Sequence, residues 1–544
     1  MVQNSPARDA GAVLSQLAPL FAGSKGTLGE LHTLLLRAPE RLHHPVRLAV
    51  VGQIKKGKST LVNALIGRQL AATGVLETTF RINEFRYGDR EVARAHYRDE
   101  RLGVPRIEEV PLDALAGLTV RNPARAAELS GLTRIVIDLP EELLLTFELI
   151  DTPGLYSVYG EDSENTLAVI GRKRAAELTD ASADEMRHAD AILYLFSRDL
   201  GAADAEEVGR FLGPGGTHAI GAMRALGVVS KCDMVWPPGK ASLDYNPVEE
   251  VGRQWIRDYQ AAEPELGRLF YDIIPVAGLV AEGAQTISAE SFNWLNDLSR
   301  REPGALLSLL RYRDDFVSAE LPGVSLSVQQ RTELDRRLGP WGIMLACRYL
   351  RLRCTEKEVR EHLVTDSGVR RVREQATSQF VGKRAYLIKL DRILTDIREL
   401  ITIQLPVGHG SADPVAQVRD TVEEITDREQ GLWAMDVLRL VGQGRLQLPD
   451  TGRLRRLVEP GTSCAVRLGL PEGTPPADLM PAASAEVSYW QRRKTDFPSA
   501  DPEALVAVWQ VLRTAEGIYD RVSRAEQLLR EADRLRDQAR LLLD

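Results

Sequence analysis

The most constraining feature of this chain is a glycine-rich loop between an apolar run and a helical pattern. Residues Gly52 to Ser59 read Gly-Gln-Ile-Lys-Lys-Gly-Lys-Ser, the G-x-x-x-x-G-K-[ST] pattern of a phosphate-binding loop. The run Val46–Val51 precedes it as a buried strand would, and Thr60–Ile66 follows as a helix. A strand, a tight turn and a helix in this order predict an α/β domain that binds a nucleoside triphosphate.

Each position of the loop has a distinct chemical task. Gly52 and Gly57 let backbone N–H groups curl around phosphate oxygens without a Cβ in the way. Lys58 is expected to reach the β- and γ-phosphates, and Ser59 to offer its hydroxyl to Mg²⁺. The nucleotide-binding residues predicted here are Gly52, Gln53, Ile54, Lys55, Lys56, Gly57, Lys58, Ser59 and Thr60.

Two later motifs favour guanine over adenine. Ser230-Lys231-Cys232-Asp233 follows the apolar run Leu226–Val229. The Asp233 carboxylate can accept two hydrogen bonds from guanine N1 and N2, a donor pair that adenine lacks, and the Lys231 stem can pack on the base. Ser230 stands where GTPases usually carry Asn or Thr. After another strand, a small-residue turn is expected to present a backbone amide to guanine O6; its residues are Val276, Ala277 and Gly278.

A metal site should lie beside the phosphate loop. Asp151-Thr152-Pro153-Gly154 follows an apolar strand, so Asp151 can hold a water on Mg²⁺ and the Gly154 N–H can approach the γ-phosphate. A threonine between the loop and Asp151 should complete the metal shell, and we favour Thr79 over the adjacent Thr78. The predicted metal-binding residues are therefore Ser59, Thr79 and Asp151, the last through a water.

Pattern changes along the chain predict four segments. Residues 1–44 carry N-terminal helices, and residues 45–285 alternate strands with helices, as in an α/β GTPase domain with a mostly parallel sheet. Residues 286–500 read as a helical stalk. Residues 501–544 read as one long helix that returns to the N-terminal helices and forms a neck with them. Strands are expected at Val46–Val51, Thr79–Arg86, Arg134–Leu139, Leu144–Ile150, Ala191–Phe196, Leu226–Val229 and Asp272–Pro275; stalk helices are expected at Val328–Leu352, Thr355–Leu363, Val369–Ile403 and Val415–Val441.

Composition argues against several other classes of protein. The net charge of −8 is not that of a protein that coats nucleic acid. The 4 cysteines form no C-x-x-C pair, so neither a zinc site nor a disulfide framework is suggested, and a reducing cytoplasm is expected. The sequence shows no run near the ~18–20 apolar residues of a transmembrane helix, so any membrane contact should be peripheral.

Taken together, these motifs resemble the bacterial dynamin-like GTPases, especially those of actinobacteria. Leu70–Thr79 is similar to the family's L-P-x-G-V-x-P-x-T switch, although Ala71 and Glu77 stand where prolines are common. Further matching segments are Phe85–Gly88, Ile150–Leu155 and Ala189–Tyr194, and a looser one is Ser367–Lys389.

The resemblance implies a Mg²⁺-dependent GTPase head on a helical neck and stalk, which converts GTP to GDP and phosphate. It also implies that heads dimerise across the nucleotide, with a second copy or a paralogous dynamin-like partner, and that the protein binds or remodels a lipid membrane. The expected location is the cytoplasmic face of the inner membrane, where relatives act in septation or protection from membrane stress. Two alternatives stay open: a regulatory switch that acts through a protein partner, and a scaffold in which hydrolysis is secondary.

The catalytic residues depart from two familiar patterns. Leu155 stands where small GTPases keep a water-orienting Gln. Dynamins use the phosphate loop instead, and animal members place polar residues that hold a monovalent cation where this chain has Ile54 and Lys55. We expect the Lys55 ammonium to replace that cation, with Lys58 and Thr79 as the other catalytic residues. The alternative is that Lys55 is an ordinary solvated lysine.

Membrane-contact residues are only weakly marked in the sequence. Trp341–Leu345 and Leu405–Gly408 are candidates for an apolar tip, with core packing and an ordinary turn as the respective alternatives. Trp236 follows Asp233 closely and is expected at the rim of the base site.

Overall fold

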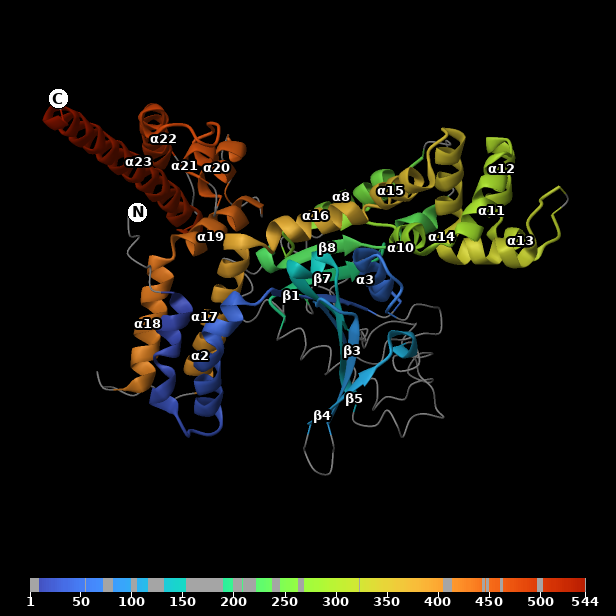
Figure 1. The fold of residues 1–544 in the computed structure, drawn as a ribbon, viewed down its shortest axis with the longest axis horizontal. Helices are drawn as coiled ribbons and strands as arrows, with labels where there is room; N and C mark the ends of the chain where they lie inside the picture. The colour runs from blue at the N-terminus through green and yellow to red at the C-terminus, as the bar shows by residue number, and fades with distance from the viewer. Residues whose placement is uncertain are drawn as a thin grey trace. The chain divides into compact units, whose positions relative to one another are not determined.

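The chain divides into two compact units. We call residues 45–216 and 224–381 the head unit, and residues 1–44, 217–223 and 382–544 the helical unit (Figure 1). The structure, a computed structural model, describes residues 9–53, 55–71, 82–98, 105–115, 132–152, 189–198, 208, 222–236, 245–262, 269–321, 323–404, 413–442, 446, 450–459, 463–496 and 502–543. Within these ranges, no helix has the length and apolar content needed to cross a membrane.

A nine-stranded sheet runs through the described part of the head unit, in the order β4-β3-β5-β2-β6-β1-β7-β8-β9. β1 is parallel to both its neighbours, β6 and β7, and β8 and β9 continue in parallel. β2 is parallel to β5 but antiparallel to β6, and β3 is antiparallel to β4 and β5. The mostly parallel sheet predicted from the sequence is therefore confirmed. The strands are β1 (Val46–Gly52), β2 (Ile82–Tyr87), β3 (Val92–Arg98), β4 (Pro105–Val110), β5 (Leu132–Leu139), β6 (Phe147–Asp151), β7 (Ala191–Phe196), β8 (Ala225–Val229) and β9 (Asp272–Pro275).

Three strands differ from the sequence-based expectation. β3 and β4 were not predicted. The pattern of β3 is weak because its buried face is formed by Ala93, Ala95 and Tyr97, and alanine is a poor strand former. The strand expected at Leu144–Ile150 begins later, at Phe147, because Glu142–Leu145 forms a 3₁₀ turn ahead of β6.

Two helices of the head unit, α10 and α16, pack against the phosphate-loop helix α3. α10 packs against both α3 and α14, α15 packs against α10, and α16 packs against α3 (Figure 1). α14 is kinked at Gly339, which adopts φ 64° and precedes Pro340. The helices are α3 (Lys58–Ile66), α8 (Arg253–Ala262), α10 (Gly278–Thr286), α11 (Ala289–Ser299), α12 (Pro303–Arg311), α13 (Arg313–Ser318), α14 (Val328–Arg351), α15 (Glu356–Asp366) and α16 (Val369–Gln379).

The head unit extends past the domain boundary expected at residue 285, because later helices cap earlier ones. Arg360 on α15 donates to the carbonyl oxygens of Ala284 and Ile287 at the end of α10, at 2.6 and 2.8 Å. Arg373 on α16 donates to the Leu65 carbonyl at the end of α3. Cations at helix C-termini satisfy the unpaired carbonyl groups there and complement the helix dipole. Helices α11 to α16 therefore belong with the sheet.

The helix expected over Val369–Ile403 is in fact two helices. α16 ends at Gln379 and α17 (Gly382–Gln404) begins at Gly382, which adopts φ 62°. Positive φ is a conformation that glycine adopts easily and other residues rarely, so this position ends one helix before the next begins. The boundary between the two units falls at the same place, between Val381 and Gly382.

The helical unit joins N-terminal and C-terminal segments, as the sequence predicted. α2 packs against α17 and α1 against α18. Arg41 pairs with Asp396 at 3.1 Å, and the buried Lys389 ammonium donates to the carbonyl oxygen of Leu42 at 2.6 Å. The helices are α1 (Ala10–Ser15), α2 (Thr27–His43), α17, α18 (Pro414–Arg428), α19 (Gln430–Gly442), α20 (Thr451–Val458), α21 (Cys464–Arg467), α22 (Pro476–Asp496) and α23 (Pro502–Leu543).

The final helix α23 runs over nearly the whole segment expected for it, but its packing differs from the expectation. It lies against α22, α19 and α20, whereas the N-terminal helices lie against α17 and α18. Its apolar stripe is buried from Ala504 to Val522. Beyond Val522 the stripe is exposed, with Leu528 and Leu535 at 55% and 65%.

Candidate functional site

The phosphate loop takes the shape that its two glycines allow. Gly52 adopts φ 144°, and a Cβ added there would lie 2.3 Å from the carbonyl oxygen of Leu195 in β7. Gly57 adopts φ 91°, and apart from its chain neighbours no atom of the described residues lies within 4 Å of the place where a Cβ would stand. Lys55 also has positive φ, at 63°, which is uncommon for a residue with a side chain and marks a constrained turn.

Lys58 places a buried cation inside this loop. Helix α3 begins at Lys58, so the N–H groups of its first turn are available to an anion. The Lys58 side chain is 7% exposed, and its Nζ donates to the carbonyl oxygens of Gly52 and Gln53, both at 3.0 Å. Loop, helix N-terminus and ammonium together have the geometry and charge that the predicted phosphate site requires.

Ser59 and Asp151, two of the residues predicted to bind the metal, lie in contact beside the loop. The Ser59 hydroxyl donates to Asp151 Oδ2 at 2.9 Å. Asp151 ends β6 next to β1 and is fully buried, and this burial raises the pKa of its carboxyl to about 6, although the Lys58 charge acts in the opposite direction. A buried carboxyl of this kind gains from a cation that restores its charge.

The polar atoms around Asp151 fit a hydrated Mg²⁺. Asp151 Oδ1 and both amide atoms of Asn83 are buried and have no hydrogen-bond partner among the described residues. Leaving such a group unsatisfied costs about 1–3 kcal/mol, and water molecules on a metal ion would satisfy them. Ser59 and Asp151 would hold the ion, which, when bound, would neutralise charge on the β- and γ-phosphates.

Ser230 ties the base-reading motif to the phosphate loop. Its hydroxyl lies 2.7 Å from the Lys56 carbonyl oxygen and 3.1 Å from the Phe196 carbonyl oxygen. From the other side, the Lys56 ammonium donates to the Ser197 hydroxyl at 2.7 Å. The serine that departs from the usual Asn or Thr therefore still links the base-reading turn to the phosphate loop.

Lys231 and Asp233, the residues predicted to contact a guanine base, lie just after β8. Lys231 adopts φ 61° and begins the short 3₁₀ turn Cys232–Val235. Burial raises the pKa of the Asp233 carboxyl to about 6, against the effect of backbone hydrogen bonding and of the Lys231 charge. Burial also lowers the pKa of Lys231, and the neighbouring Lys56 adds to this shift.

The Val276–Gly278 turn is beside this motif, but two of its three amides are engaged within the protein. The Val276 N–H donates to the Val229 carbonyl at 2.7 Å, and the Ala277 N–H donates to the Ser367 carbonyl at 2.8 Å. Gly278 is the first residue of α10, so its N–H points out of the first helical turn. Of the three, Gly278 is the amide best placed to meet guanine O6.

Several predicted residues lie outside the described ranges. These are Ile54, Thr78, Thr79, Gly154 and Leu155. The apolar tip expected at Leu405–Gly408 lies outside them as well. By contrast, Trp341–Leu345 is described and buried, with Trp341 2% and Ile343 0% exposed, so it packs in the core of the head unit and is not a membrane tip.

Sequence reasoning missed three residues that the structure brings to the site. Ser197 follows β7 directly, Asn83 lies within β2, and Ser367 comes from the segment between α15 and α16. Ser197 could have been found, because polar residues at the carboxyl end of a parallel strand commonly line a ligand site. Ser367 and Asn83 could not, because they depend on long-range packing and on strand register.

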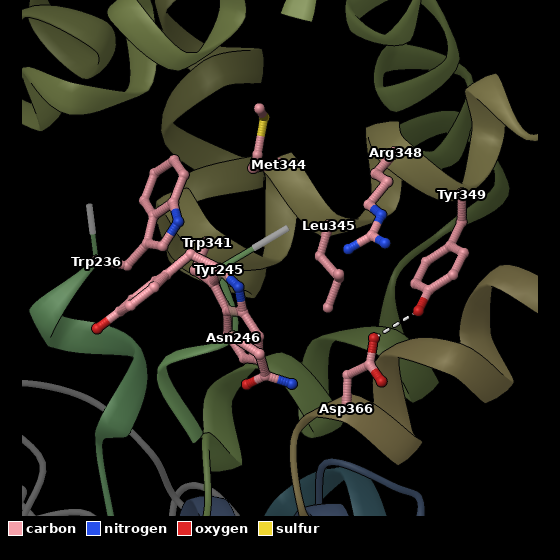
Figure 2. Close-up of a pocket in the computed structure, with 9 residues that line it drawn as sticks. All are labelled: Trp236, Tyr245, Asn246, Trp341, Met344, Leu345, Arg348, Tyr349 and Asp366. Carbon is pink, nitrogen blue, oxygen red and sulfur yellow. Dashed lines mark hydrogen bonds between the residues drawn. The ribbon is translucent and has the colours of Figure 1, made fainter. Parts of the chain in front are cut away.

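A separate cavity is lined by Trp236, which directly follows the Cys232–Val235 turn. It has a volume of about 220 Å³, and Trp236, Trp341 and Tyr245 are among its lining residues (Figure 2). On its opposite side the Tyr349 hydroxyl donates to Asp366 at 2.6 Å (Figure 2). The described residues that line it include none of the predicted nucleotide-binding residues. Trp236 is 8% exposed and belongs to this buried cluster.

Comparison with known protein families identifies the class of protein as a GTPase. A model of the dynamin family matches residues 48–212, which span the phosphate loop, Asp151 and β7. Residues 48–212 therefore form a dynamin-type domain, and the similarity supports a bacterial dynamin-like GTPase.

Individual relatives extend this similarity. The chain is 28% identical over 505 residues to the isoniazid-induced protein IniC of Mycobacterium tuberculosis, covering 90% of this chain and 93% of that protein. It is 34% identical over 111 residues to dynamin-like protein 2 of Campylobacter jejuni, covering 20% and 17% of the two chains. A solved structure described as "an oligomerised bacterial dynamin pair" aligns over 100% of this chain and 94% of the other, with 14% identity and a TM-score of 0.34.

Proposed function

We propose that this protein hydrolyses GTP with Mg²⁺ and couples head dimerisation to binding or remodelling of a membrane at the cytoplasmic face of the inner membrane. The observation that carries the nucleotide part is the Ser230–Lys56 hydrogen bond, because it joins a guanine-reading turn to a phosphate loop in one site. Similarity to the dynamin family supports the membrane part. The partner in dimerisation would be a second copy or a paralogous dynamin-like protein.

The site supports GTP as the substrate through complementary groups at both ends. Asp233 can accept from the guanine N1–H and N2–H donors, and the Gly278 amide can donate to O6. Lys58 and the first turn of α3 would bind the β- and γ-phosphates, while Ser59 and Asp151 would hold the metal. Lys55 is exposed at the turn of the loop, where its ammonium would stabilise the charge that develops between the β- and γ-phosphates.

A combined turnover and liposome experiment tests the proposal. GTP hydrolysis is measured with and without Mg²⁺, and sedimentation with anionic liposomes is measured with no nucleotide, GDP and a non-hydrolysable GTP analogue. We expect Mg²⁺-dependent turnover that rises with protein concentration, and sedimentation that depends on nucleotide. The Lys58→Ala variant should lose nucleotide binding, so any of its sedimentation is nucleotide-independent.

The outcomes separate the proposal from its alternatives. Hydrolysis without liposome sedimentation in any nucleotide state would favour a regulatory switch that acts on a protein partner. Assembly detected by light scattering on adding the analogue, with no liposomes present and negligible turnover, would favour a scaffold. Wild-type nucleotide affinity in Lys58→Ala would contradict the site assignment itself.

A further inference from the structure

Strand register places Asn83 beside the metal-site aspartate. β2 and β6 are antiparallel, and Asn83 is the residue directly opposite Asp151. Side chains of directly opposed residues in an antiparallel pair lie on the same face of the sheet, with Cβ atoms about 4.5–5.5 Å apart. Ser59 on α3 contacts Asp151 through a hydrogen bond of 2.9 Å. Asn83 thus adds an amide to the site that contains Ser59 and Asp151.

Burial of the Asn83 amide without hydrogen-bond partners among the described residues costs free energy. Asn83 is 1% exposed, and neither its Oδ1 nor its Nδ2 reaches hydrogen-bond geometry with another described group. Asp151 Oδ1, on the opposed residue, is in the same condition. The amide is nevertheless close enough to the carboxyl to lower the pKa of Asp151. Asparagine is also disfavoured in strands, and the next residue on this face, Phe85, is an ordinary buried hydrophobe.

We propose that Asn83 is a positioning residue of the nucleotide site: its Nδ2 donates to the unpaired Asp151 oxygen and its Oδ1 accepts from a water held by Mg²⁺. The inference rests on the proposed Mg²⁺-dependent GTP site and adds a residue to it. A carboxamide suits this place because one end donates and the other accepts, so it can orient a carboxylate and a water at once. Partners of this kind fix the orientation of metal ligands and tune metal affinity.

The test measures how nucleotide binding depends on Mg²⁺, without using turnover. Binding of a fluorescent GDP analogue is followed at a series of free Mg²⁺ concentrations and again in excess chelator. For Asn83→Leu, which keeps the size and removes both polar atoms, the Mg²⁺ concentration at half-maximal effect should rise about tenfold. Affinity in chelator should stay within about twofold of wild type, because the amide acts through the metal.

Two further variants separate positioning from a merely structural role. Phe85→Leu disturbs the packing of the same strand face and keeps the amide, so its Mg²⁺ midpoint should match that of wild type. Asn83→Ser keeps one hydroxyl and should shift the midpoint less than leucine does, which also provides a reading if Asn83→Leu does not fold.

The possible results distinguish a failure of this inference from a failure of the proposed function. Wild-type Mg²⁺ midpoints in the folded Asn83 variants would overturn the inference and leave the GTP site standing. An equal midpoint shift in Phe85→Leu would also overturn it, because strand packing would then explain the effect. Nucleotide binding by the wild-type protein that ignores Mg²⁺ would instead overturn the proposed metal-dependent function on which the inference rests.

Discussion

Removing the Ser230 hydroxyl should weaken nucleotide binding more than it destabilises the fold. The hydroxyl has one proton and two nearby acceptors, the carbonyl oxygens of Lys56 and Phe196. Phe196 O already accepts from the Ser230 N–H at 2.8 Å, so the hydroxyl proton is best used on Lys56 O at 2.7 Å. Ser230→Ala therefore leaves one acceptor without its donor.

The size of the loss in affinity depends on whether the Lys56 carbonyl oxygen can reach water when its donor is removed. A buried acceptor that loses its partner costs about 1–3 kcal/mol, but in the nucleotide-free protein the loop can turn and let Lys56 O meet water. When nucleotide is bound, the loop must keep its shape, so the larger part of the loss falls on the bound state. We expect affinity for GDP to fall about tenfold, which corresponds to about 1.4 kcal/mol. The free energy of unfolding without nucleotide should fall by less than about 1 kcal/mol.

The assay is fluorescent GDP binding together with urea unfolding of the nucleotide-free protein. Ser299→Ala is the matched control, because Ser299 is also buried and donates to the Asn296 carbonyl at 2.7 Å, away from the predicted nucleotide residues. Ser230→Asn should restore affinity to within about threefold, since a longer amide can also donate to Lys56 O. Unchanged affinity in Ser230→Ala, with a clear loss of stability, would refute the reasoning.

Three further predictions follow from the same site. Lys55→Ala should lower the turnover number at least about tenfold with GTP affinity nearly unchanged, and exchange of Na⁺ for K⁺ should leave wild-type turnover unaffected; strong K⁺ dependence would contradict this. Asp233→Asn should shift base preference from guanine to xanthine by at least about tenfold in competition binding, because an amide can donate to the xanthine O2. The Asp151 carboxyl has its pKa raised from 3.8 to about 6, so its contribution to the stability of the nucleotide-free protein is present below about pH 4 and lost as pH rises through 6. Asp151→Asn should accordingly melt higher than wild type at pH 7.5, and the difference should shrink as pH falls below 6; a constant difference in thermal shift would count against it.

The positions of the Gly52–Ser59 loop, of Asp151 and of the Ser230–Asp233 turn could be predicted from the sequence, because each is a short local pattern at the end of an apolar strand. Ser59 and Asp151 lie 92 positions apart. The sequence nevertheless assigns both to the metal site, because each belongs to a short motif at the end of a parallel strand. Ser230 departs from the usual Asn or Thr, and the sequence alone could not predict that its hydroxyl would contact the Lys56 carbonyl oxygen.

What escaped prediction depends on contacts that no local pattern contains. Asn83 lies opposite Asp151 because of the β2–β6 register. The alternation of residues along one strand does not predict which residue of the neighbouring strand is paired with it. The boundary at Gly382 was missed because apolar spacing continues on both sides of it, so α16 and α17 looked like a single helix. The capping by Arg360 and Arg373 joins residues far apart in the chain.

Arg360 and Arg373 limit where the chain can be cut to give a fragment that folds. A fragment that stops at residue 285 would remove the cations from the carboxyl ends of α10 and α3, and would strip α14 from the face where Gly283 lies close to the Arg337 backbone. The smallest piece expected to fold and bind nucleotide by itself therefore runs from 45 to 381. Natural or engineered fusions should accordingly tolerate a new partner after Val381 far better than one inserted between α10 and α16.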